Sequence, residues 1–86
     1  MDQTQIFNKI KEIVTPFSKA KEAVAQATPA SRFLEDFQIN SARLIDIILA
    51  LEDAFDIEIS DEQADGILTM EDAVKLVLSQ LEKATA

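Results

Sequence analysis

The stretch FLEDFQINSARLIDIILALEDAFD, residues 33–56, decides the fold that this sequence predicts. From Ser41 to Phe55 its apolar residues recur with the period of an α-helix, 3.6 residues per turn. Five of them share one face, which is the pattern of a helix packed against a core: Leu44, Ile47, Ile48, Leu51 and Phe55. The residues before the helix are expected to form a loop that leads to Asn40 and Ser41.

Ile45 and Leu49 lie off that face, about 100 to 140 degrees away from Leu44 at ~100 degrees per residue. They are four residues apart, so they contact each other on the helix surface. Three acidic residues flank the pair on the helical wheel: Asp46, Glu52 and Asp53. The acidic surroundings favour a docking face for basic protein partners. The alternative is that the pair packs beneath a neighbouring segment, because single apolar residues are common on surfaces.

Ser41 stands at the start of this helix, where Ser or Asn usually acts as the N-cap. Because Asn40 and Ser41 are adjacent, one of them suffices as the cap and the other is free. Ser41 could act as a nucleophile only beside a base. The chain has no histidine, so we expect no enzyme activity. An exposed hydroxyl at a helix N-terminus is better suited to carry a phosphodiester, which the backbone N–H groups and the helix dipole would stabilise.

Residues 33–78 resemble the acyl carrier protein family. In that family an Asp-Ser-Leu motif opens the second helix and its serine carries phosphopantetheine; here the segment is Asn40-Ser41-Ala42. The preceding FLEDF, residues 33–37, is similar to the family's approach to the motif. The run LALEDAFDIEI, residues 49–59, and the segments 61–64 and 69–74 are similar to the family's sequence after the motif. The joint pattern is specific to the family.

The resemblance implies an all-α fold: a bundle of three main helices plus one short helix, with a long first loop. It also implies a 4′-phosphopantetheine arm, derived from coenzyme A and attached to Ser41, with Asn40 as the helix cap beside it. Acyl intermediates would be bound to this arm as thioesters in fatty-acid, polyketide-like or unusual-lipid biosynthesis. The implied partners are a phosphopantetheinyl transferase and ketosynthase, acyltransferase, reductase or dehydratase enzymes with basic docking patches.

Two sets of residues acquire roles from this resemblance. The first is expected to dock onto the partner enzymes: Ile45, Asp46, Leu49, Glu52, Asp53 and Asp56. The second is expected to line the space into which a carrier folds its acyl chain: Leu51, Ile59, Ala64, Ile67, Ala73 and Leu76. Ordinary core packing is the alternative for the second set, and both roles can hold together. The alternative function for the whole chain is a small acidic helical interaction module without a prosthetic group.

Three departures from the family motif are present. Asn40 replaces the motif Asp, which keeps the capping oxygen but loses a charge. Ala42 replaces the motif Leu, and Arg43 stands where an acidic residue is usual. Both changes alter the surface that a transferase grips. We therefore expect a specialised carrier with its own transferase preference, in secondary metabolism or the synthesis of an unusual lipid.

Composition agrees with a small carrier. The 86 residues are expected to form one domain, 1–86, with a modest core. The net charge of −8 disfavours nucleic acid and anionic membranes. No apolar run is long enough to span a membrane, and the first residues lack the layout of a secretory signal, so a cytoplasmic monomer is expected.

No metal site is predicted. Without cysteine, neither disulfides nor thiolate ligands are available. A calcium loop starting at Asp56 would need Gly and Glu at its sixth and twelfth positions, where Asp61 and Ile67 stand.

Before residue 41, the sequence predicts a helix over 3–14, interrupted by Pro16. A short or frayed helical piece is expected within 17–26, with a thin apolar stripe. In the loop after this piece, three residues are expected to plug the core: Phe33, Leu34 and Phe37.

After the central helix, residues 56–59 predict an extended connector and residues 61–65 a short helix. Gly66 is expected to end that helix as its C′ residue. Thr69, with Asp72 three positions on, predicts the start of a last helix that runs to about Glu82. The tail from residue 83 on is expected to fray.

Overall fold

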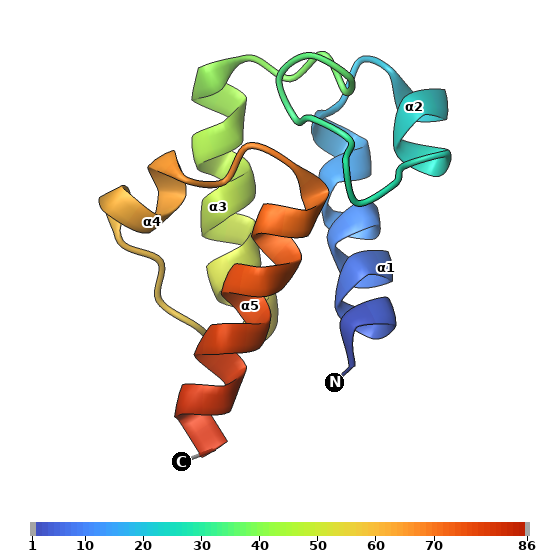
Figure 1. The fold of residues 1–86 in the computed structure, drawn as a ribbon. Helices are drawn as coiled ribbons and strands as arrows, with labels where there is room; N and C mark the ends of the chain where they lie inside the picture. The colour runs from blue at the N-terminus through green and yellow to red at the C-terminus, as the bar shows by residue number, and fades with distance from the viewer. Residues whose placement is uncertain (1, 86) are drawn as a thin grey trace.

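The computed structural model describes residues 2–85, with side-chain surroundings up to residue 82, and shows a bundle built on three long helices (Figure 1). These are α1 (Gln3–Val14), α3 (Ser41–Phe55) and α5 (Met70–Thr85). The shorter elements are the 3₁₀ turn η1 (Thr15–Phe17) and the helices α2 (Lys21–Ala25) and α4 (Asp61–Asp65). The predicted all-α bundle is confirmed.

α1 begins with a capping box. The Asp2 carboxylate accepts a hydrogen bond from the Gln5 N–H at 2.8 Å, and the Gln5 side chain accepts one from the Asp2 N–H at 3.0 Å. Three apolar side chains of α1 are buried in the core: Ile6, Ile10 and Val14. The interruption expected at Pro16 takes the form of η1, which comes directly after α1.

The long connection between α1 and α3 crosses one end of the bundle (Figure 1). Its helical piece, α2, lies within the predicted range 17–26 and is short, as expected, and within α2 only Val24 is buried. Phe33 and Phe37 are fully buried, with their ring centroids 5.8 Å apart in an edge-to-face arrangement. The prediction for Leu34 was wrong, because its side chain is 43% exposed. The turn that buries both phenylalanines leaves Leu34 on its outer side.

α3 has the predicted bounds, and four residues of the predicted face are buried, while Leu44 is half-buried against the same core. It ends at Asp56, whose backbone adopts the left-handed conformation with φ of 54°. The extended connector comes next, with Ile57 buried and Ile59 half-buried.

α4 starts with a capping box in which the Ser60 hydroxyl accepts from the Gln63 N–H at 3.2 Å. The C′ role predicted for Gly66 was wrong: Gly66 is the C-cap residue and has an ordinary φ of −85°. At the start of α5, Thr69 and Asp72 cap each other at 3.1 and 3.2 Å, as predicted.

The predicted end of the last helix was also wrong. α5 continues beyond Glu82 to Thr85, so only the final position of the tail, residue 86, lies outside the described residues.

Two distant loops are joined beside the core. The Phe33 N–H donates to the Leu68 carbonyl at 3.1 Å, and the Met70 N–H donates to the Ser31 carbonyl at 3.0 Å. They flank an isolated antiparallel bridge between Arg32 and Thr69. The loop that leads to α3 is therefore held against the start of α5.

Candidate functional site

Ser41 is the first residue of α3 and is exposed. The cap is Asn40, whose side-chain oxygen accepts a hydrogen bond from the Arg43 N–H at 2.8 Å. The Asn40 carbonyl accepts the next one, from the Leu44 N–H at 3.0 Å. Because Asn40 fills the capping role, the Ser41 hydroxyl is left over, and it makes no hydrogen bond within residues 2–85.

Two other serines of the chain provide a contrast. The Ser60 hydroxyl caps α4 and is engaged by the Gln63 N–H. The Ser18 side chain is only 5% exposed; its hydroxyl donates to the Phe37 carbonyl at 2.6 Å and accepts from the Ala20 N–H at 3.0 Å. Ser41 differs from both because its hydroxyl is exposed and has no structural task.

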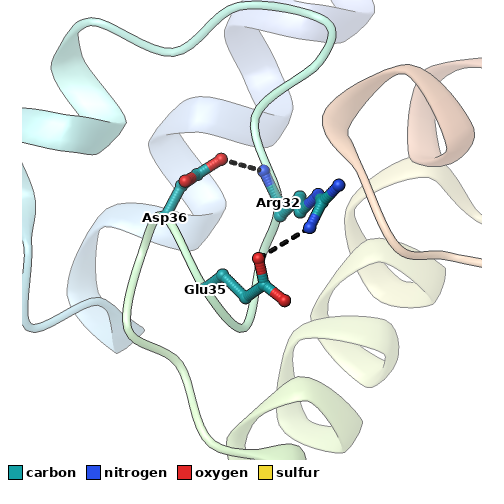
Figure 2. Close-up of polar contacts among 3 residues, drawn as sticks. All are labelled: Arg32, Glu35 and Asp36. Atoms are coloured by element: carbon teal, nitrogen blue, oxygen red, sulfur yellow. Dashed lines mark hydrogen bonds and ion pairs between the residues drawn. The ribbon is translucent and has the colours of Figure 1, made fainter.

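The loop before α3 is closed by the acidic residues of its FLEDF segment (Figure 2). The Asp36 carboxylate accepts a hydrogen bond from the Arg32 N–H at 2.7 Å, and Glu35 pairs with the Arg32 guanidinium at 2.7 Å. The hydrogen bond and charge of Glu35 raise the pKa of Arg32 above its ordinary value. Both partners of the ion pair are more than half exposed, so it stabilises the fold little. The bond to the Arg32 backbone is what shapes the turn.

Below the turn, the loop is anchored in the core. Ile39 is buried, and its N–H donates to the Phe33 carbonyl at 3.3 Å. The Ser18 hydroxyl donates to the Phe37 carbonyl, and Gln38, between Phe37 and Ile39, has a left-handed φ of 53°. These contacts fix the chain just before Asn40, which sets the position of the first turn of α3.

The outward face of α3 carries the predicted apolar pair. Ile45 is 61% exposed and Leu49 is 58% exposed, so their predicted position outside the core is confirmed. Around them Asp46, Asp53 and Asp56 are exposed and Glu52 is half-buried. Docking onto partners by this face remains a prediction.

The six residues predicted to line an acyl chain gather in the core. Leu51, Ile67 and Ala73 are buried, and three half-buried residues pack against the same cluster: Ile59, Ala64 and Leu76. Two surface pockets, of about 510 and 410 Å³, are lined by other residues. The acyl-binding role of the six remains a prediction.

Within the described residues, no cluster of carboxylates is arranged to hold a metal ion. None of the helices in residues 2–85 combines the length and the apolar character needed to cross a membrane.

Comparison with known proteins decides the family. No family model matches the chain. A curated protein of Rubrobacter xylanophilus named Acyl carrier protein is 40% identical over 78 residues, which cover 91% of this chain and 94% of that protein. The chain belongs to the acyl carrier protein family. The resemblance inferred from residues 33–78 is thus confirmed. Acyl carrier proteins are carriers and not enzymes, they generally bear 4′-phosphopantetheine, and they interact with a modifying transferase and with biosynthetic enzymes.

The surroundings of Ser41 fit such a group. The hydroxyl is exposed, and the N–H groups of Ser41 and Ala42 have no acceptor within the described residues. Free N–H groups in the first turn of a helix stabilise a bound phosphate, and the helix dipole adds to the effect. A phosphodiester on the Ser41 oxygen would lie next to these groups.

Proposed function

We propose that this chain carries acyl intermediates as thioesters on a 4′-phosphopantetheine arm attached to Ser41. The observation that supports the proposal best is the division of labour at the start of α3. Asn40 caps the helix, and the exposed Ser41 hydroxyl is left without a structural task. A hydroxyl in this position can be modified without loss of a contact that holds the fold.

In this proposal the protein chain positions the attachment point, and the prosthetic group provides the reactive atom. The arm, when attached, provides the thiol on which acyl groups are carried. The Asn40 cap fixes the first turn, so that Ser41 stays outward and the N–H groups of Ser41 and Ala42 can hold the phosphodiester. Tethering then keeps the cargo at high effective concentration for each enzyme in turn.

Partner enzymes would dock on the outward face of α3. Ile45 and Leu49 offer exposed apolar contact area, and the acids around them suit the basic patches expected on the transferase and on the enzymes that load, extend and release the chain. The buried set around Leu51 and Ala73 would part to admit an acyl chain. Acidic surfaces of this kind also speed association with basic partners at low salt.

The motif departures bear on the pathway. Ala42 removes apolar surface next to Ser41, and Arg43 adds a positive charge where family members are usually acidic. From these changes we infer a transferase selective for this carrier and a specialised lipid or polyketide-like pathway. The location that we propose for this pathway is the cytoplasm.

Mass spectrometry tests the attachment. The chain is incubated with coenzyme A and a broad-specificity phosphopantetheinyl transferase, beside the variants Ser41→Ala and Ser60→Ala. The wild type and Ser60→Ala are expected to gain the mass of phosphopantetheine, and Ser41→Ala is expected to gain nothing. Ser60→Ala is a matched control because Ser60 also stands at a helix start and is exposed.

An adduct on Ser41→Ala would refute the attachment site. Absence of an adduct on the wild type with several transferases would favour the alternative, an acidic helical interaction module that uses Ile45 and Leu49 without a prosthetic group.

A further inference from the structure

A second feature lies next to the start of α3, on the side that faces the end of α1. It is a surface pocket of about 410 Å³. Residues of η1, with Ser18 and Lys19 after it, form one wall; Gln38, Asn40 and Arg43 form the other. The end of α1 and the start of α3 lie at the same end of the bundle (Figure 1). The volume falls within the range of small-molecule sites in proteins.

The pocket is positively charged in a chain of net charge −8. Lys19 and Arg43 are lining residues, and no acidic residue is among the lining. Lys19 has no ion pair within the described residues. Arg43 is only loosely paired: its guanidinium lies 3.8 Å from the carboxylate of Asp46, and its side chain is 61% exposed. Two available cations favour an anionic ligand at this place.

The position of the pocket decides which anion can reach it. Ser41 and Arg43 are two residues apart on α3, which places them about 200 degrees apart around the helix axis. A phosphodiester bonded directly to the Ser41 oxygen stays on the Ser41 side. The distal end of a long flexible arm can instead pass over the N-terminus of α3 and reach the pocket. The group at the distal end is the acyl cargo.

We propose that this pocket binds the free carboxylate of a dicarboxylic acyl cargo carried on the arm of the same chain, with Lys19 and Arg43 as its partners. The proposal rests on the attachment of the arm to Ser41. A purely hydrocarbon cargo would gain little here, because burying the cationic and amide groups of the lining without hydrogen-bond partners is unfavourable. Attachment to the chain raises the effective concentration of the carboxylate, so two exposed cations suffice to hold it.

NMR of the loaded chain tests the pocket. A transferase loads Ser41 from two stable, amide-linked coenzyme A analogues, which carry a succinyl or a succinamoyl group. These two cargoes have nearly the same shape, and only the first is charged. We expect the backbone amides of Lys19, Gln38 and Arg43 to shift several-fold more between the two loaded forms than amides elsewhere. The difference should shrink as salt is added, because exposed ion pairs are screened.

Variants supply the control. In Lys19→Gln/Arg43→Gln the carboxylate-dependent shifts are expected to disappear. In Lys9→Gln/Lys75→Gln, which removes the same number of charges from exposed positions outside the pocket, they are expected to persist. Mass spectrometry measures the loading of both double variants independently, and the shifts are compared only between loaded forms.

Equal shifts for the two cargoes, or shifts that survive Lys19→Gln/Arg43→Gln, would overturn the proposal. If the shifts at the pocket appear with the bare arm and do not respond to the carboxylate, the pocket binds the arm itself. That result would also overturn the proposal. A chain that loads without carboxylate-dependent shifts refutes only the pocket. A chain that cannot be loaded refutes the attachment to Ser41 as well.

Discussion

Both faces of α3 carry large apolar residues, but only those of the inward face are buried in the core. The inward face presents Ile47, Leu51 and Phe55, all buried in the hydrophobic core. The outward face presents Ile45 and Leu49, each about three-fifths exposed. Close packing dictates the shape and size of every inward residue. Packing within the chain does not require the exposed pair, Ile45 and Leu49, to be apolar. Their apolar character is therefore best explained by a binding partner.

The largest effect should distinguish Leu51 from Leu49, which stand two residues apart on the same helix. Leu51→Ala leaves a cavity in the core and is expected to lower the free energy of unfolding by about 2–5 kcal/mol. Leu49→Ala is expected to change it by less than about 0.5 kcal/mol. Urea denaturation followed by circular dichroism measures both. Equal losses in the two variants would mean that the outward face is packed in solution.

Partner binding should show the reverse order. Ile45→Ala and Leu49→Ala are each expected to weaken binding of the transferase by about 1–2 kcal/mol, roughly five- to thirtyfold, because apolar anchors dominate interfaces. Leu68→Ala is the matched control, since Leu68 is 60% exposed but lies outside α3. Calorimetric titration measures the affinities. A loss with Leu68→Ala as large as that with Leu49→Ala would argue against a docking face on α3.

Charge reversal sharpens the role of the acids around the pair. Asp46→Lys/Asp53→Lys is expected to slow association with a basic partner by about tenfold at low salt, because the acids steer the encounter. The unfolding free energy should change little, since both residues are exposed. Stopped-flow measurements at two salt concentrations report the association rate. Identical rates for the variant and the wild type at low salt would refute electrostatic docking by this face.

The N-cap of α3, Asn40, can be tested separately from both faces of the helix. Asn40→Ala is expected to lower the free energy of unfolding by about 1 kcal/mol, because the Arg43 N–H loses its acceptor. Asn40→Asp restores the family's motif residue, keeps the acceptor and adds a charge that favours the helix N-terminus. The free energy of unfolding of Asn40→Asp should equal that of the wild type or exceed it by a few tenths of a kcal/mol. Thermal denaturation of the three proteins measures these differences in stability. A lower stability of Asn40→Asp than of the wild type would show that the cap needs the amide.

The sequence predicted α3 well because its signals are local. Periodicity located the buried face, and Asn40 beside Ser41 marked the start within one residue. Leu34 was misplaced because its surroundings depend on a tertiary turn, in which Phe33 and Phe37 compete for the same interior. Local apolar character could not show which of the three would face solvent.

The pocket beside α3 could not be predicted from the sequence, because it too depends on tertiary structure. Lys19 and Arg43 are far apart in the sequence and come together only because the first connection folds back on the start of α3. The bond between the Ser18 hydroxyl and the Phe37 carbonyl, which holds that connection, leaves no pattern in the sequence. Ser41 could be proposed from the sequence because the residues that point to it, the cap and the family motif, lie within a few positions.

Glycine placement misled the prediction of helix ends. Gly66 was expected to need a special conformation, yet its φ is −85°. The left-handed position at the end of α3 is held instead by Asp56, with φ of 54°, and Asp is one of the few residues besides Gly that adopt it routinely. The chain therefore has a glycine where one is not required and none where one would fit.

Gly66→Ala should therefore stabilise the protein, by about 0.4–1 kcal/mol, because alanine restricts the unfolded chain and fits the native backbone. A Cβ at this position would lie 3.5 Å from the Gln63 carbonyl oxygen, an ordinary contact. Asp56→Ala should change stability in the opposite direction, because alanine in the left-handed region costs about 1 kcal/mol. Urea denaturation with an unchanged m-value would attribute both changes to stability. A loss of stability in Gly66→Ala would mean that the end of α4 uses a conformation closed to alanine.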